Sequence, residues 1–532
     1  MPYSITNLCI RCDSCLPQCP TGAIKLEGED YWIDPLLCND CEGYYSEPQC
    51  VTSCPTGSPV PWQAKKGRCK TNIRTATSPS LFPDGKSHPF ASAIVVWEAC
   101  NVLAQRQSLP WKADEADRLY YQRHIHQGQG SIGFQITHTL DPLPPTPLSK
   151  EVALATLSTF DVRSACLHLI YAAHATVLER PWEQEFIIND QQIEEYLGLE
   201  KRKDLSKPAR LALIKDLVQQ PCQIQVSIDW LAQGRVAGFS LRESRLWHLL
   251  EVQHHFQEDD LGCKHLVGLT FKLRAGQWTQ YFLNQQGYRD RTAFYQYGSL
   301  PKLLLSTVMS IWQQHEGAAR MMLWLLFKAK VGREQRLTVP TLMRVAYGEE
   351  RILHASTHRE HRKRLLRTFE SDLEVLNHHG LKPVFDPVTY APEIQPLWAR
   401  LSELPDDADA ALEFWVNDGS GSTRLTDAAP RGKWNRLMHA RILYFELPPQ
   451  WSRQPAATNR KKQRSSQRRT KAKPQLTLSA EDVVKARKNL QWSQRQLAEK
   501  TGKSQSWIRD IENNRFRAKL EDQVLLRKVL GI

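Results

Sequence analysis

The chain has 532 residues, which is more than one hydrophobic core can organise, so we expect roughly three or four domains. Apolar residues make up 41% and charged residues 24% of the chain, as in soluble globular proteins. The most apolar run, Met321–Phe327, is too short to cross a membrane, and Met1–Ile10 lacks the pattern of a signal peptide. These features predict a cytoplasmic protein with no membrane partner.

The net charge of +13 is unevenly distributed. Residues 1–60 contain two basic and eight acidic side chains, which gives −6 there and leaves +19 for residues 61–532. An acidic head on a basic body indicates two different tasks, and a polyanion is the expected partner of the body.

Eight of the thirteen cysteines lie between residues 9 and 54. Because a cytosolic chain has little use for dense disulfides, this cluster predicts metal binding. Thiolates spaced two apart on a tight loop can reach three corners of one cubane cluster, and the fourth ligand must come from elsewhere. The cysteines form two such runs: Cys9-x2-Cys12-x2-Cys15-x3-Cys19-Pro20 and Cys38-x2-Cys41-x8-Cys50-x3-Cys54-Pro55.

These runs resemble those of bacterial two-cluster ferredoxins, in which each run supplies the fourth ligand of the other run's cluster. The eight-residue spacer Glu42–Gln49 departs from the simplest form of that pattern. The alternative is a pair of zinc sites, but zinc modules use two separated cysteine pairs, and four cysteines within eleven residues fit this poorly. The resemblance implies two 4Fe–4S clusters, one held by Cys9, Cys12, Cys15 and Cys54 and the other by Cys38, Cys41, Cys50 and Cys19.

Residues 61–150 are rich in Pro, Ser and Gln, and we interpret them as a loosely structured connector with one helix around Ala91–Gln107.

The next two segments, 151–290 and 291–450, each predict the order strand, helix, helix, strand. In the first segment these elements are Phe186–Ile188, a helix through Ile193 and Leu197, Pro208–Val218, and a strand through Ile224, Val226 and Ile228. In the second they are Leu337–Val339, Pro340–Ala346, a long helix with Leu365, Phe369, Leu373 and Leu376 on one side, and Leu381–Phe385. This order is typical of winged helices, and two copies in one chain resemble plasmid replication initiators.

The periodicity of the middle fits a generic α+β core without DNA contact equally well. The basic stretch Arg359–Arg367 favours nucleic acid, although it could also be a solvated helix face. The histidines show no metal-ligand spacing, and we find no phosphate loop, serine nucleophile elbow or His-Glu zinc motif. The sequence therefore predicts a protein that is not an enzyme.

Residues 451–475 read as a disordered linker. Its segment Arg460–Lys473 has eight basic residues in fourteen and no acidic ones, which would add salt-sensitive affinity for DNA that does not depend on its sequence.

Residues 476–532 predict a compact helical domain. Ser479 and Ser493 each begin a capping box, Gly502 permits a sharp turn, and Ser504 caps a third helix in which Trp507, Ile508 and Ile511 pack inward. Two short capped helices around a turn with Gly make a helix-turn-helix. A helical hairpin that serves only protein contacts is the alternative.

The segment Trp492–Arg515 resembles the lambda-repressor, Cro and XRE family, from which it departs at Asn514, where Gly is usual. The resemblance implies a homodimer on double-stranded DNA, with the second helix on the backbone and the third in the major groove. The implied contacts are Gln494 to a phosphate, Gln505, Ser506 and Arg509 in the major groove, Asp510 to cytosine, and Asn513 and Arg515 to the backbone.

The predicted fold class is multidomain α+β: a small ferredoxin-like head, an α-rich middle with tandem winged helices, and an all-α tail. This arrangement resembles the cyanobacterial PatB/CnfR regulators of nitrogen fixation, on the evidence of residues 1–60 and 476–532. The resemblance implies activation of nitrogenase genes under low oxygen or in heterocysts, contact with RNA polymerase, and clusters that sense oxygen. An electron-transfer protein, and a replication initiator or repair factor, remain as alternatives.

Overall fold

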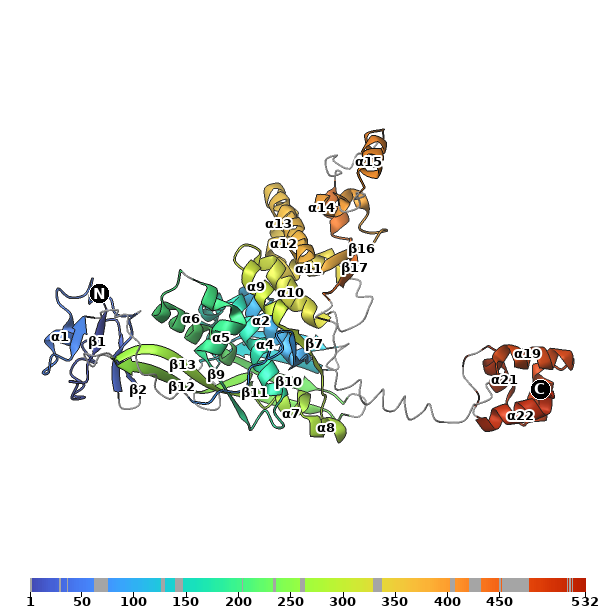
Figure 1. Ribbon diagram of the computed structural model, residues 1–532, viewed down its shortest axis with the longest axis horizontal. Helices are drawn as coiled ribbons and strands as arrows, with labels where there is room; N and C mark the ends of the chain where they lie inside the picture. Colours follow the sequence, from blue (N-terminus) through green and yellow to red (C-terminus); the bar gives the residue numbers. More distant parts are fainter. Residues whose placement is uncertain are drawn as a thin grey trace. The chain divides into compact units, whose positions relative to one another are not determined.

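The computed structural model of the chain is shown in Figure 1. The chain divides into two compact units, Met1–Gln454 and Pro455–Ile532. No helix in the described part of the chain is long and apolar enough to cross a membrane. The predicted basic segment Arg460–Lys473 lies outside the described residues, which are all except 1, 28–29, 36, 62–74, 126–129, 139–146, 203, 233–235, 259–263, 329–336, 402–406, 421–431, 449–450, 452–477, 514, 516–517 and 519.

The cysteine-rich head is built from two small antiparallel strand pairs. Strand β1 (Tyr3–Ile5) pairs with β4 (Pro59–Pro61), and β2 (Ile24–Glu27) pairs with β3 (Asp30–Ile33). The short helix α1 (Gln49–Thr52) contains Cys50. Gly22 and Gly57 follow the two cysteine runs at equivalent places with φ of 61° and 62°, a conformation that glycine adopts without strain.

The helix predicted around Ala91–Gln107 is confirmed, but strands on both sides of it correct the prediction of a loose connector. The segment forms β5 (Ser87–Ala91), α2 (Ile94–Gln105), the 3-10 turn η1 (Arg106–Ser108), β6 (Lys112–Ala113), β7 (Leu119–Ile125) and β8 (Gly130–Ile136). Ten of the twelve residues of α2 are buried. The composition was misleading because β8 gains its burial from a distant partner, as in the pairing of Ile136 with Ile224.

The first predicted strand–helix–helix–strand segment forms its elements, but its last strand joins a different sheet. Strand β10 (Ile224–Trp230) lies in a five-stranded sheet of order β11-β10-β8-β7-β6. The first strand of the segment, β9 (Glu185–Asn189), lies in a separate sheet of order β12-β13-β9. It pairs there with β13, the second strand of a long hairpin. The remaining elements are α3 (Lys150–Thr159), α4 (Val162–Thr176), α5 (Asp190–Leu197), η3 (Leu199–Lys201), α6 (Lys207–Gln219), η4 (Gln220–Gln223), β11 (Phe239–Arg245), β12 (Trp247–Glu258) and β13 (Lys264–Ala275).

The second segment also forms the predicted elements and repeats the same sheet order. Its strands β15 (Leu337–Thr338), β16 (Lys382–Phe385) and β17 (Arg441–Glu446) are ordered β15-β17-β16, so the first and second strands both pair with the third. Its helices are α10 (Glu316–Lys328), α11 (Val339–Tyr347), α12 (Glu349–Thr357) and α13 (Arg359–His378). The other elements are α7 (Thr279–Phe282), α8 (Gln285–Arg289), β14 (Tyr297–Pro301), α9 (Lys302–Ile311), η5 (Pro392–Ile394), α14 (Leu397–Leu401), α15 (Ala408–Ser420) and α16 (Lys433–Leu437).

The C-terminal unit contains the three predicted helices and a fourth that sequence reasoning missed. These are α19 (Ala480–Asn489), α20 (Gln494–Thr501), α21 (Gln505–Glu512) and α22 (Leu520–Leu530). Both predicted capping boxes are confirmed, as are the left-handed Gly502 (φ 66°) and the Ser504 cap. Trp507 is only half-buried, because Leu526 and Leu530 of α22 complete the core around Ile508 and Ile511.

Candidate metal centre and nucleic-acid interface

The head contains two cavities, and each gathers four cysteine side chains. Apolar residues such as Ile5 in one cavity and Ile33 in the other complete their walls. The structure thus brings together the same two quartets that the ferredoxin resemblance implies. One cavity is lined by Cys9, Cys12, Cys15 and Cys54, and the other by Cys19, Cys38, Cys41 and Cys50.

Backbone turns in the cysteine loops position these side chains. Arg11 and Asp13 in the first loop, and Asp40 and Cys41 in the second, have φ between 57° and 63°. Non-glycine residues take this left-handed conformation at some cost, so several in two short loops indicate that the loops are shaped around a ligand.

The last cysteine of each run is held by the threonine two residues later. The Cys19 and Cys54 sulfurs lie 3.6 and 3.5 Å from the hydroxyl oxygens of Thr21 and Thr56. The Ser58 N–H also donates to the Cys54 sulfur at 3.4 Å. Burial raises the pKa of both thiols, but these hydrogen bonds outweigh it and lower the pKa overall. Both thiols therefore lose their protons more readily than an ordinary cysteine does, which favours the thiolate form that binds iron.

The deeper thiols fit an iron–sulfur cluster for a complementary reason. Burial, with the neighbouring Cys38 and Cys41 sulfurs, raises the pKa of Cys50 to about 12, and burial raises the pKa of Cys15 to about 11. Without metal these side chains stay neutral thiols at pH 7, and bound iron would supply the positive charge that stabilises the thiolates. In the described residues, no group of three or more His, Cys, Asp or Glu side chains closes around a single metal ion.

In the C-terminal unit, a buried ion pair joins the first and third helices. The Arg487 Nε and Nη2 donate to the two Glu512 carboxylate oxygens at 2.6 and 3.0 Å. The Gln494 amide donates to the same carboxylate at 2.7 Å, so the residue predicted to contact a phosphate is oriented by Glu512. Sequence reasoning missed Arg487 and Glu512, because their 25-residue separation gives no local signal.

The remaining predicted DNA-contacting residues differ in accessibility. Gln505, Ser506 and Arg509 are exposed at the start of α21, as are Asn513 and Arg515 after it. Asp510 is half-buried, and its carboxylate lies 3.4 Å from Arg515 Nη1 and 4.0 Å from Arg509 Nε. Asp510 therefore has internal partners that compete with a cytosine. Asn514 lies outside the described residues.

The middle has a basic helix face on α13. Arg359, Lys363, Arg364 and Arg367 are exposed along it. By contrast, Arg362 donates to the backbone oxygens of Ala355 and Ser356 at 3.1 and 2.6 Å, which anchors the start of α13 to α12. The imidazole rings of His354, His358 and His361 gather beside this face, with centroids 4.2–5.9 Å apart.

Comparison with known families matches both ends of the chain. Residues 2–25 match a family described as a 4Fe-4S binding domain, and residues 483–532 match one described as helix-turn-helix. Ferredoxin-1 of Chlorobaculum tepidum is 46% identical over 55 residues, which cover 10% of this chain and 89% of that protein. Through its head, the chain belongs to the ferredoxin family.

Two other relatives match the ferredoxin head. An uncharacterized ferredoxin-like protein of Haemophilus influenzae is 49% identical over 55 residues, and a ferredoxin-like protein in the nif region of Nostoc sp. is 50% identical over 58 residues. Each match covers 10% of this chain, and the chain spans 64% and 50% of the two relatives. The chain thus joins a ferredoxin-like iron–sulfur head to a helix-turn-helix DNA-binding tail.

A solved structure also aligns with about half of the chain. Domains 2–3 of RctB align over 52% of this chain and 83% of that one, with 11% identity and a TM-score of 0.26. This value is too low to indicate a shared fold.

Proposed function

We propose that the protein is an iron–sulfur-dependent transcriptional regulator, with two 4Fe–4S clusters in the head and α21 reading promoter DNA. The observation that carries this proposal is the sorting of eight cysteines into two four-thiol cavities on a chain that also has a helix-turn-helix. We further propose that it activates nitrogen-fixation genes under low oxygen, as a cytoplasmic homodimer in contact with RNA polymerase. The nif-region relatives of the head support this choice of target genes.

The proposed signal is the loss of the clusters. When bound, they would cross-link the cysteine loops and would be open to oxidation. Cys12 and its neighbours Ile10 and Asp13 are exposed, so oxygen can reach this edge of the first cavity. Because the head has only a small apolar core of its own, loss of these cross-links would unfold it and change the output of the whole chain.

The test compares three samples of the full chain: anaerobic protein, air-exposed protein and the Cys12→Ser variant. We expect the anaerobic protein to bind the promoters of nitrogen-fixation genes and activate transcription, and the other two samples to lose activation. Cys100→Ala, in the buried helix α2, is the matched control and should behave as the wild type. Arg509→Ala should keep the clusters but bind DNA weakly. Equal activity of all three samples would refute the sensing proposal.

A second candidate function is favoured by the repeated sheet order in the middle. In both sheets, β12-β13-β9 and β15-β17-β16, the strand before the helices and the next strand of the sheet each pair with the third strand, and we propose that both segments are winged helices. Two winged helices would suit a replication initiator. Mapping the DNA sites of the protein in anaerobic cells distinguishes the functions: promoters support the regulator, and repeated origin sequences support the initiator.

The two proposed winged helices differ in whether the basic side chains of their helices form ion pairs. In the first, Lys207 of α6 contacts Asp190 and Glu194 at 3.0 and 3.1 Å. In the second, Arg359, Arg364 and Arg367 of α13 form no ion pair within the described part of the chain. If the middle binds nucleic acid, α13 is therefore the favoured surface.

A further inference from the structure

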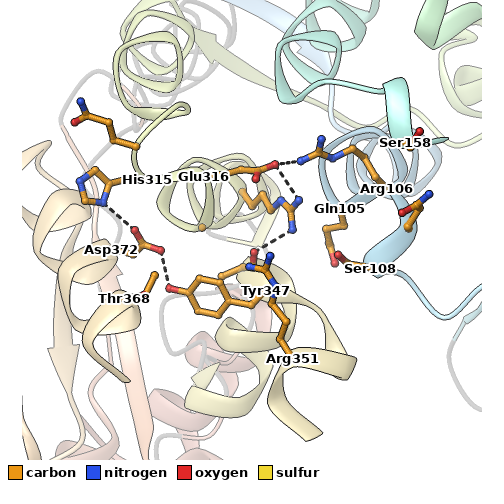
Figure 2. A pocket seen from close by; sticks show the side chains of 15 residues that line it. Gln105, Arg106, Ser108, Ser158, His315, Glu316, Tyr347, Arg351, Thr368 and Asp372 are labelled. Atoms are coloured by element: carbon orange, nitrogen blue, oxygen red, sulfur yellow. Dashed lines mark hydrogen bonds and ion pairs between the residues drawn. The ribbon is translucent and has the colours of Figure 1, made fainter. Parts of the chain in front are cut away.

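A cavity of about 390 Å³ lies where the end of α2 meets α10, α11, α12 and α13 (Figure 2). This volume is typical of sites for small molecules. The cavity is far in sequence from both the cysteine head and the helix-turn-helix tail, and the proposed function does not use it. Its wall contains three arginines and two carboxylates: Arg106, Arg320, Arg351, Glu316 and Asp372.

One of the two carboxylates is already satisfied by other partners. The buried Asp372 side chain accepts hydrogen bonds from the Tyr347 hydroxyl at 2.6 Å and from His315 Nδ1 at 3.0 Å (Figure 2). Asp372 is therefore not available to neutralise the arginines.

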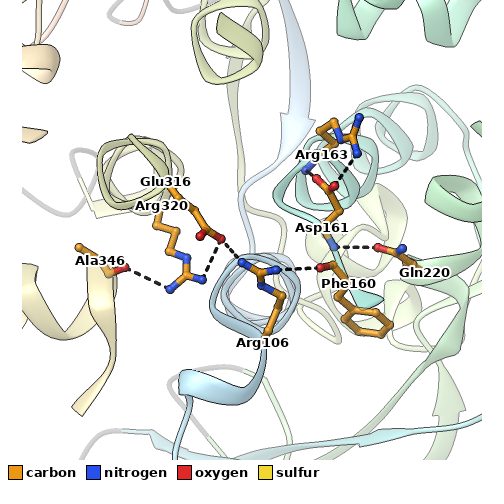
Figure 3. Close-up of polar contacts among 8 residues, drawn as sticks. All are labelled: Arg106, Phe160, Asp161, Arg163, Gln220, Glu316, Arg320 and Ala346. Carbon is orange, nitrogen blue, oxygen red and sulfur yellow. Dashed lines mark hydrogen bonds and ion pairs between the residues drawn. The ribbon is translucent and has the colours of Figure 1, made fainter. Parts of the chain in front are cut away.

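The other carboxylate, Glu316, is shared between two arginines (Figure 3). It accepts from Arg106 and, at 2.9 Å, from Arg320. The Arg320 side chain is only 8% exposed, and its Nε has no hydrogen-bond partner in the structure. Arg351 forms no hydrogen bond or ion pair with a described residue. Three guanidinium groups thus line the cavity, and Glu316 is the one carboxylate of its described wall that is paired with any of them, so positive charge is in excess there.

The electrostatics of Arg320 reflect this excess. Burial lowers its pKa, Glu316 opposes that effect, and repulsion from Arg106 and Arg351 lowers the pKa further. Positive charge that is partly buried without a full set of partners destabilises a protein, and a bound anion would remove this cost.

The backbone around the cavity is also arranged for an anion. Helix α10 begins at Glu316, so the N–H groups of its first turn lie at the cavity wall. A Cβ on Gly317 would lie 2.2 Å from Asp372 Oδ2, so only glycine lets this helix end approach so closely. Arg106 has φ 55° and ψ −125°, a strained conformation for a non-glycine residue that ligand sites often contain.

We propose that this cavity binds a small anion with two or more negative charges on phosphate or carboxylate oxygens. Arg351 and Arg320 would donate to it, Arg106 would orient Glu316, and the first turn of α10 would lie beside it. Arginine suits this role because its planar donors match both oxyanions. The backbone of a DNA duplex is too bulky to reach the nearly buried Arg320, which favours a free anion over nucleic acid.

The test uses the full chain, prepared anaerobically, and isothermal titration calorimetry at constant ionic strength. Pyrophosphate and succinate are titrated separately, and the one that binds in a saturable manner identifies the phosphate or the dicarboxylate class. Arg351→Gln should weaken this binding at least about tenfold, the effect of one lost charge-assisted hydrogen bond. Arg351→Lys, which keeps the charge, should lose less.

Arg289→Gln is the matched control, because Arg289, at the end of α8, is also exposed but lies outside the cavity wall. It should bind the anion as the wild type does, and circular dichroism should show all variants folded. The proposal is overturned if neither anion binds, or if Arg351→Gln binds as well as the wild type. If neither anion binds and Arg351→Gln weakens the binding of duplex DNA, the arginines of the cavity contact nucleic acid instead.

Discussion

Thr21 and Thr56 are the residues through which the chain can tune the two cysteine sites independently. Each hydroxyl contacts the sulfur of one cysteine, and the two contacts are equivalent because each threonine lies two residues after the last cysteine of its run. Hydrogen bonds to ligand sulfurs stabilise the more negative, reduced state of a cluster and so raise its reduction potential.

Replacing Thr56 by Val should therefore make the potential of the cluster that uses Cys54 more negative. A hydrogen bond of about 1 kcal/mol corresponds to about 40 mV for one electron. An anaerobic redox titration of the full chain, followed by electron paramagnetic resonance, measures the shift. Thr56→Ser keeps the hydroxyl and should restore the wild-type potential. An unchanged potential in Thr56→Val would mean that the hydroxyl does not bond to the sulfur.

At the scale of elements, the helix-turn-helix depends on the pair Arg487–Glu512, which ties α19 to α21. Glu512 is 4% exposed, and its carboxylate accepts from both Arg487 and Gln494. Burial alone would raise the pKa of Glu512, but these donors outweigh it and lower the pKa below its usual value of 4.5. The ion pair thus stabilises the unit at neutral pH and is lost as the pH falls below about 4.5.

Glu512→Ala should destabilise the C-terminal unit by about 3 kcal/mol, because it leaves the nearly buried Arg487 without its partner. Amide hydrogen exchange of α19–α21 in the full chain measures this local stability. Glu499→Ala, on the exposed side of α20, is the control and should change little. In the wild type, protection should fall below pH 4.5, and in Glu512→Ala it should vary less with pH. Equal protection in both variants would contradict this role.

An element could be predicted from the sequence when the residues that determine it lie close together in the chain. Ser479, Ser493 and Gly502 act within one helical turn, so the three helices of the tail were predicted with their caps. The two cysteine runs were recognised from local spacing, whereas the exchange of Cys19 and Cys54 between the quartets came from the ferredoxin resemblance. Strand β8 and the pair Arg487–Glu512 depend on partners 88 and 25 residues away, as in Ile136 with Ile224, and no local pattern reports them. The arginine cavity was missed likewise, since it joins Arg106 to Arg320 and Arg351.

At the scale of the Met1–Gln454 unit, the head is not an independent appendage. Trp32 of β3 packs against His254 and Phe256 of β12, with ring centroids 5.5 Å apart in both pairs. Lys215 of α6 in turn contacts His254 at 3.2 Å. The head therefore lies against the hairpin and the helix that, in the proposed winged helix of the first copy, would meet DNA. This placement agrees with the ion pairs of Lys207 on α6, whereas Arg359, Arg364 and Arg367 of α13 form none with the described residues.

This contact offers a route from cluster state to DNA binding, and Trp32→Ala tests it. Trp32 lines neither cysteine cavity, so the variant should keep the visible absorption of its clusters. Its head should detach, because the aromatic contact is lost, and amide exchange should accelerate in α6 and β12. We expect the same acceleration when oxygen removes the clusters of the wild type. Tyr44→Ala, at an exposed position of the same head, should leave exchange unchanged. If Trp32→Ala exchanges like the wild type, the head does not cover this surface and cluster loss must act on DNA binding by another path.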